Sequence, residues 1–317
     1  MKIYIHVGYP KNASTTLQTD IFPNINGLLY LGRYYQDTQA YHTKELSDAL
    51  YDVAMKDSID FSDELNIKRI RLTLNKIGTK FNKVLISSEA FSNNVADRGL
   101  IAHRLKVIFP EAKIIIIIRN QVDALKSMYK FLCAQLGKNI NLSYGRPSVQ
   151  SFDQWIDDQE NFFPRSYINT LRYDQLIFRY KTLFGKENVK TLLFEHLRKS
   201  PNQFFSQIED FVEAKIKFNS DPKFIPSRNQ SPTKKALIYY KLRQKFPKIV
   251  PSKYFPRFVT KLWHKILFSS NEGSSEFYIS NAIEEKILSY YYQSNRRLQE
   301  DFDVDLEKLC YFQKAKF

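Results

Sequence analysis

Short apolar runs alternate with longer amphipathic segments along this chain, and this alternation predicts its secondary structure. Apolar runs bounded by turn-forming residues predict strands at 2–8, 83–88, 112–118 and 188–194, with a shorter one at 27–31. Apolar positions that recur every three or four residues predict helices near 14–22, 40–56, 63–80, 97–108, 121–136, 151–160, 171–184 and 200–213. Strands that alternate with helices form βαβ units, so we expect an α/β fold with a central parallel sheet covered on both faces.

A strand, a tight loop and the start of a helix follow one another over residues 2–17. Gly8 interrupts the apolar alternation of the strand, and residues 14–16, Ser-Thr-Thr, open the helix. The first N–H groups of a helix lack intrahelical partners and carry the positive end of its dipole. Lys11 adds a charge within the same loop, so the segment predicts a phosphate or sulfate site for a nucleotide-like ligand.

The common loop of this kind, G-x-x-x-x-G-K-[ST], binds nucleoside triphosphates. Residues 8–15 have its length, but Ala13 and Ser14 stand where that motif has its second Gly and its Lys. The lysine has moved to the middle of the loop, at Lys11, so its charge meets a different point of a bound phosphate chain. A P-loop kinase-like phosphotransferase stays open as an alternative function.

A second pair of anion-binding residues follows the β-branched run at 112–118, which is typical of a fully buried parallel strand. Arg119 ends this strand, and Ser127 lies two turns along the predicted helix that follows. Arg offers a planar fork of donors and Ser a hydroxyl group, so both side chains suit one phosphate. The alternative is that Arg119 merely ends a strand and Ser127 is an exposed helical residue.

Both segments resemble motifs of the sulfotransferases that use 3′-phosphoadenosine 5′-phosphosulfate (PAPS). The early loop is similar to the family's 5′-phosphosulfate loop, P-K-x-G-[ST]-T, and its matching residues are Pro10, Lys11, Ser14 and Thr15. Ala13 stands where the family usually has Gly. Because Ala reaches most of the same backbone angles unless φ is positive, we expect this departure to matter little.

The later segment is similar to the family's 3′-phosphate signature, R-N-P-x-D-x-x-x-S-x-Y. The residues in register are Arg119, Asn120, Asp123, Ser127 and Tyr129, and Gln121 replaces the Pro. Residues 173–197 resemble the family stretch Y-x-x-L…F-G-x-E-N-V-x-V-x-x-Y-E-x-L, and residues 227–237 resemble the N-x-S…A-L segment of bacterial members.

The resemblance implies a P-loop-like three-layer sandwich and an enzyme that transfers a sulfuryl group from PAPS, its co-substrate, to an acceptor hydroxyl without a metal. It implies that the donor is held by Lys11, Asn12, Ala13, Ser14, Thr15, Thr16, Arg119, Ser127 and Arg228. Lys11 is also expected to be catalytic, because it neutralises the bridging oxygen as the leaving phosphate gains charge.

Glu89 is the candidate general base, because it follows the predicted strand at 83–88. If this strand lies beside the first one, Glu89 reaches the same carboxyl edge of the sheet, where ligands of open α/β sheets bind. Many carbohydrate sulfotransferases place a carboxylate in this region, whereas cytosolic members often use His, and no His lies in this stretch. Ser87 and Ser88 are candidates for contacts with donor or acceptor. The alternative is that Glu89 forms an ion pair with Lys11 or caps a helix.

The composition agrees with a globular enzyme. The chain has 317 residues, of which 43% are apolar and 26% charged. Cys133, Cys310 and five scattered histidines form neither a disulfide framework nor a metal-ligand pattern, so we expect no metal site. We expect an α/β core at 1–220, followed at 221–317 by a basic, aromatic-rich helical extension that packs on the core.

The basic segment, residues 222–270, contains twelve Lys or Arg and no Asp or Glu, in a chain of net charge +15. Aromatic residues are interleaved with these charges, which suits an anionic membrane surface or an anionic glycan. We therefore expect a glycan or glycolipid acceptor, and no nucleic acid partner. The alternatives are two amphipathic helices with exposed lysines, or a non-catalytic adaptor that binds membranes or nucleic acid.

The start of the chain does not read as a targeting segment. Its first apolar stretch, residues 3–7, is too short and too early interrupted for a signal peptide. The longest isoleucine run is far shorter than the roughly 18 apolar residues that a membrane span requires. We expect a cytoplasmic enzyme that associates with the inner face of the membrane.

Overall fold

The computed structural model describes residues 1–31, 44–78, 80–92, 98–134, 151–161, 166–218, 279–301 and 306–312. Arg228 and the whole basic segment lie outside the described residues, so their predicted roles stay predictions. None of the helices in the described part of the chain combines the length and the apolar character of a membrane span.

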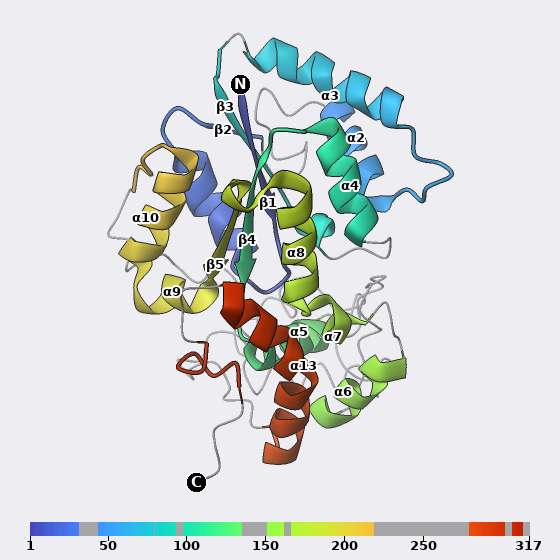
Figure 1. Cartoon of the computed structure of the whole chain (residues 1–317), viewed down its shortest axis with the longest axis vertical. Helices are drawn as coiled ribbons and strands as arrows, with labels where there is room; N and C mark the ends of the chain where they lie inside the picture. The colour runs from blue at the N-terminus through green and yellow to red at the C-terminus, as the bar shows by residue number, and fades with distance from the viewer. Residues whose placement is uncertain are drawn as a thin grey trace, which may run out of the picture. The chain divides into compact units, whose positions relative to one another are not determined.

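A five-stranded sheet forms the centre of the first compact unit (Figure 1). Its strands are β1 (Lys2–Val7), β2 (Leu29–Tyr30), β3 (Lys83–Ser88), β4 (Lys113–Ile118) and β5 (Val189–Leu193). They lie in the order β2-β3-β1-β4-β5, and every neighbouring pair is parallel. The predicted α/β fold with a parallel central sheet is therefore confirmed.

Helices cover both faces of this sheet (Figure 1). On one face η1 (Leu17–Ile21), η2 (Phe22–Asn24) and α10 (Pro201–Val212) pack on the sheet through a shared apolar core. On the other face α8 (Tyr173–Phe184) packs on β4 and β5, and α4 (Arg98–Ile108) packs on α8. Residues 114–118 of β4 are fully buried, because a central parallel strand has helices on both sides.

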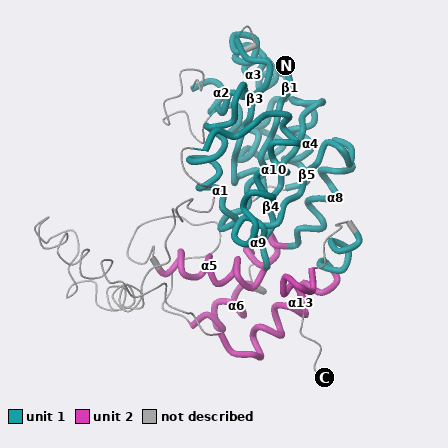
Figure 2. The backbone as a smooth tube through the Cα atoms, turned by 90° about the vertical axis from the view of Figure 1, so that its left-hand side faces the viewer, with its two compact units in different colours: residues 1–120, 172–228, 294–305 teal, residues 121–171, 229–293, 306–317 magenta. Residues whose placement is uncertain are grey.

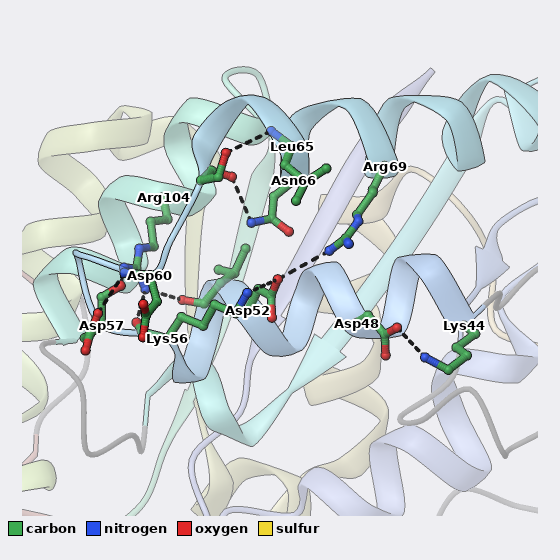
Figure 3. Close-up of polar contacts among 12 residues, drawn as sticks. Lys44, Asp48, Asp52, Lys56, Asp57, Asp60, Leu65, Asn66, Arg69 and Arg104 are labelled. Atoms are coloured by element: carbon green, nitrogen blue, oxygen red, sulfur yellow. Dashed lines mark hydrogen bonds and ion pairs between the residues drawn. The ribbon is translucent and has the colours of Figure 1, made fainter.

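A buried arginine closes the end of α2 (Lys44–Met55), as Figure 3 shows. Arg104, only 2% exposed on α4, donates hydrogen bonds to the carbonyl oxygens of Val53, Lys56 and Asp57. The last carbonyls of a helix lack intrahelical partners, so this side chain satisfies them. The contact joins α2 to α4 beside α3 (Asp63–Gly78).

The chain divides into two compact units, which Figure 2 distinguishes by colour. Residues 1–120, 172–228 and 294–305 form the first unit, and residues 121–171, 229–293 and 306–317 form the second. The second unit contains α5 (Gln121–Ala134), α6 (Phe152–Asn161), α7 (Tyr167–Thr170) and most of α13 (Asn281–Asp301). The predicted division into 1–220 and 221–317 stays a prediction, because much of the later segment lies outside the described residues.

Aromatic packing and one buried hydrogen bond organise the second unit. The Phe152 and Trp155 rings of α6 contact the Tyr129 ring of α5, with centroids 5.4 and 5.7 Å away. The Tyr291 hydroxyl of α13 donates to the Ile168 carbonyl of α7 over 2.6 Å. The second unit therefore has its own apolar packing.

Candidate donor-binding and catalytic site

The direction of the chain through the sheet reverses between β1 and β4. The strands after β1 fill one side of it, at β2 and β3, and the chain then crosses to β4 and β5 on the other side. Ligands of open α/β sheets bind outside the carboxyl ends of the strands at such a switch point. The loop that carries Lys11 follows β1, and Arg119 follows β4, so both lie at this edge.

Two residues of the loop adopt left-handed backbone conformations. Lys11 has φ 69°, and Ala13 has φ 65° and ψ 9° just before α1 (Ser14–Thr16). For a side chain with a Cβ atom this region is strained, and such strain is concentrated at ligand-binding sites. The expectation that Ala13 replaces Gly at little cost is therefore wrong, because it held only for a negative φ. A left-handed residue followed by a helical one forms an anion-binding concavity of N–H groups.

Gly8 allows the loop and Glu89 to approach each other closely. A Cβ atom on Gly8 would lie 2.9 Å from Ser14 Oγ, 3.2 Å from Glu89 Cγ and 3.2 Å from His6 Cε1. A real Cβ atom needs more room than this, so the turn after β1 requires glycine. Glu89 starts η4 (Glu89–Phe91) at the end of β3, and the parallel β1–β3 pair brings it beside the loop.

Lys11 shares this edge with two other charged groups. Burial lowers the pKa of its ammonium group, the nearby Glu89 carboxylate opposes that shift, and the Arg119 guanidinium adds to it. Arg119 Nη1 also donates a hydrogen bond of 3.0 Å to the Lys11 carbonyl oxygen. The structure therefore brings together Lys11, Glu89 and Arg119, which the sequence predicted as one site.

Asn12 supports the loop from inside the protein. Its side chain is fully buried, and Nδ2 donates to the Ile117 carbonyl over 3.0 Å and to the Tyr173 hydroxyl over 3.4 Å. Its backbone N–H donates to the Tyr9 carbonyl over 3.2 Å. Asn12 thus ties the loop to the ends of β4 and α8, so it shapes the predicted donor site through the backbone.

The hydroxyl residues at the start of the helix differ in their placement. Ser14 is 2% exposed, and its hydroxyl donates to the Tyr9 carbonyl over 3.0 Å. Thr15 and Thr16 are half-buried. Ser14 therefore helps to close the loop, whereas Thr15 and Thr16 keep a more open position at the same helix end.

A histidine does lie next to Glu89 in space, although none lies next to it in the sequence. His6 pairs with Ser87 across β1 and β3, and its Nδ1 lies 2.8 Å from the Ser87 hydroxyl. Gln18 Nε2 donates to the same hydroxyl over 2.8 Å. Burial lowers the pKa of His6 to about 3, so the ring is neutral near pH 7. His6 and Ser87 are fully or almost fully buried, so they support the site from below.

The β4–β5 register positions further residues beside Arg119. Ile118 pairs with Leu193, so Arg119 and Phe194 are the next residues along two neighbouring parallel strands. The Arg119 guanidinium lies over the Phe194 ring, 4.5 Å from its centroid. Glu195 accepts a hydrogen bond of 2.7 Å from the Asn120 N–H group. Sequence reasoning gave Phe194 and Glu195 no role, although both directly follow a predicted strand at the ligand-binding edge.

The remaining predicted residues lie elsewhere or outside the described part. Ser127 is half-buried on α5, in the second compact unit. Arg228 is not among the described residues. Within the ranges described above, no cluster of three or more His, Cys, Asp or Glu residues is arranged to hold a metal ion.

These features define an α/β protein with an anion-binding loop and an arginine at one switch point of a parallel sheet. The family model of the sulfotransferase domain matches residues 100–267, more than half of the chain. The chain therefore belongs to the sulfotransferase family and is a sulfotransferase enzyme. The match includes Arg119 and Ser127 but begins after the Lys11 loop, so that loop rests on its own motif and geometry.

Solved structures agree with the fold. The chain is similar to a sulfotransferase from Alicyclobacillus acidocaldarius, with TM-score 0.56 and 16% identity over 97% of this chain and 98% of that one. A mouse sulfotransferase complexed with PAP gives TM-score 0.40 and 12% identity over 98% of this chain and 86% of that one. The sulfotransferase domain of the Synechococcus PCC 7002 olefin synthase gives TM-score 0.35 and 14% identity over 70% and 78%. No curated protein matches the chain.

Proposed function

We propose that this sulfotransferase takes its sulfuryl group from PAPS and transfers it to a hydroxyl group of a glycan or glycolipid. The product of the donor is adenosine 3′,5′-bisphosphate (PAP). The observation that best supports this donor is the contact between the Lys11 loop and Arg119, joined by their hydrogen bond of 3.0 Å. PAPS carries anionic groups on both sides of its ribose, and two adjacent anion-binding elements suit such a ligand.

The residues present fit the donor. The concavity at Ala13 and the helix start at Ser14 provide N–H groups for the 5′-phosphosulfate, and Lys11 provides the compensating charge. Arg119 provides a planar guanidinium for the 3′-phosphate, to which the family resemblance adds Ser127. When it is bound, PAPS supplies the sulfuryl group and a good leaving group.

Lys11 and Glu89 have complementary tasks in the transfer step. Glu89 accepts the proton of the acceptor hydroxyl as the acceptor oxygen forms its bond to sulfur. Lys11 stabilises the charge on the 5′-phosphate oxygen as the bond from that oxygen to sulfur breaks. The fold contributes mainly by positioning and by fixed charges, because such in-line transfer needs no covalent intermediate on the protein.

Ligand-induced stabilisation and sulfate transfer test the donor. We expect PAP to raise the thermal unfolding midpoint of the full chain, and ATP to raise it less, because a bound ligand stabilises the folded state by mass action. We also expect label to pass from PAPS carrying labelled sulfate to glycans or glycolipids of a cell extract. Stabilisation by ATP but not by PAP would contradict the proposal and favour a phosphotransferase.

Replacing the candidate base tests the catalytic role. We expect Glu89→Gln to lower the turnover number by about 10²–10⁴-fold, because an amide cannot accept the acceptor proton. The affinity for PAP should stay close to that of the native chain. Glu111→Gln is the matched control, because Glu111 is exposed and precedes β4 at the opposite edge of the sheet. Near-native turnover of Glu89→Gln would remove Glu89 from the mechanism.

A cytoplasmic location at the inner face of the membrane is part of the same proposal. The support is the charge of the basic segment, which attracts a surface that carries anionic lipids. An acceptor linked to lipid would be presented at that surface.

A further inference from the structure

We infer that Phe194 is a positioning residue for Arg119 and thereby sets the preference for a 3′-phosphorylated nucleotide. This inference rests on the proposed PAPS-dependent function. Phe194 begins α9 (Phe194–Lys199), directly after β5, and its ring lies under the Arg119 guanidinium at 4.5 Å from the centroid. At this distance the guanidinium is attracted by the face of the ring.

The contact follows from the pairing of two strands. Residues Ile114 to Ile118 pair with residues Val189 to Leu193 in parallel register. The next residue of each strand, Arg119 and Phe194, therefore leaves the sheet at the same height. The hydrogen bond of 2.7 Å from the Asn120 N–H group to Glu195 joins the two chain segments one residue further on.

Phe194 is itself held from below. Its ring is half-buried and packs against the apolar core that β1, β4, η1 and α10 share. The guanidinium thus lies on a ring that the core supports, while its Nη1 donates to the Lys11 carbonyl. A ring face and a hydrogen bond together define the plane of a guanidinium, and a bidentate contact with a phosphate depends on that plane.

The consequence is a division of labour between the two ends of the nucleotide. The Lys11 loop recognises the 5′ anionic group, which PAP and adenosine 5′-phosphate share. Arg119 on Phe194 recognises the 3′-phosphate, which adenosine 5′-phosphate lacks. Loss of the ring face is therefore expected to weaken the binding of PAP selectively.

Calorimetric titration of the full chain with PAP and with adenosine 5′-phosphate tests this inference. We expect Phe194→Leu to weaken PAP binding by about 5–30-fold and to leave adenosine 5′-phosphate binding unchanged. This factor corresponds to about 1–2 kcal/mol, the range for a cation on an aromatic face. Phe194→Tyr keeps the face and should bind PAP like the native chain.

Phe211→Leu is the matched control. Phe211 is also half-buried, packs against the same core and lies under a cation, Lys113, at 5.4 Å, but at the opposite end of β4. We expect this variant to lose stability in the way Phe194→Leu does and to keep its affinity for PAP. A thermal unfolding scan of both variants shows whether they fold.

The outcomes separate the inference from the function. Equal weakening of both nucleotides by Phe194→Leu would mean that the ring contacts the adenosine or shapes the whole loop, and it would overturn the inference. So would native PAP affinity in Phe194→Leu while Arg119→Ala loses it. In the Arg119→Ala background, Phe194→Leu should have no further effect on PAP binding. If the native chain does not bind PAP, the proposed function itself fails.

Discussion

Ala13 holds a left-handed backbone conformation where the anion loop turns into the helix, with φ 65°. At this scale the chemistry of single residues decides the shape of the loop. Asn12 and Ser14, on either side, donate from their side chains to the carbonyls of Ile117 and Tyr9. The strain at Ala13 is therefore maintained by neighbouring hydrogen bonds, as is common at binding sites.

Relief of this strain is a residue-scale prediction. We expect Ala13→Gly to raise the free energy of unfolding by about 1 kcal/mol, because glycine adopts a positive φ without a Cβ clash. Urea unfolding measures the change. Ala102→Gly, in the middle of α4, is the control and should destabilise the chain, because there glycine only adds flexibility. An equal loss of stability in both variants would contradict the strain at Ala13.

At the scale of elements, the sheet is also anchored at its amino edge, opposite the candidate site. Glu213, which ends α10 with φ 54°, accepts hydrogen bonds from the ammonium groups of Lys2 and Lys113. Lys83 donates to the Glu213 carbonyl over 2.6 Å. The starts of β1, β3 and β4 are thus joined to the end of one helix.

This cluster predicts a pH dependence of stability. Hydrogen bonds from Lys2 and then from Lys113 lower the pKa of Glu213 from 4.5 to about 2. Because the folded pKa lies below the ordinary value, the contribution of Glu213 is complete above pH 4.5 and is lost as the pH falls towards 2.

We therefore expect Glu213→Gln to be less stable than the native chain near neutral pH, and the difference to shrink as the pH falls below 4.5. Solvent and salt screen an exposed cluster, so the difference should be small and should decrease further in high salt. Urea unfolding at several pH values measures it, with Glu64→Gln on the exposed part of α3 as the control. A difference that does not vary with pH would contradict the role of the Glu213 charge.

At the scale of the whole molecule, charge is distributed unevenly along the chain. The basic segment holds twelve of the 48 Lys and Arg residues and none of the 33 Asp and Glu residues. The family match extends through most of this segment, to residue 267. The segment thus belongs to the enzyme domain, and we propose that it also attracts an anionic membrane surface.

Cosedimentation with vesicles tests this proposal. We expect the full chain to bind phosphatidylserine-containing vesicles and not neutral ones, since each basic residue near an anionic surface contributes about 1 kcal/mol. Reversal of the charge at Lys241, Arg243, Lys245 and Lys248 to Glu should reduce binding by at least about 10²-fold. PAP binding should be retained. Unchanged vesicle binding of that variant would contradict a membrane role.

The sequence by itself determined the elements and the identity of the main charged residues. The isoleucine run predicted β4, and the spacing of Lys11 and Arg119 along their motifs predicted two anion sites, because strand periodicity and loop chemistry are local properties. Only the tertiary structure decided how these residues meet. Strand order and register placed His6 beside Ser87, Glu89 against Gly8 and Phe194 under Arg119. Pairing between distant strands is set by packing over the whole sheet, which no local pattern records.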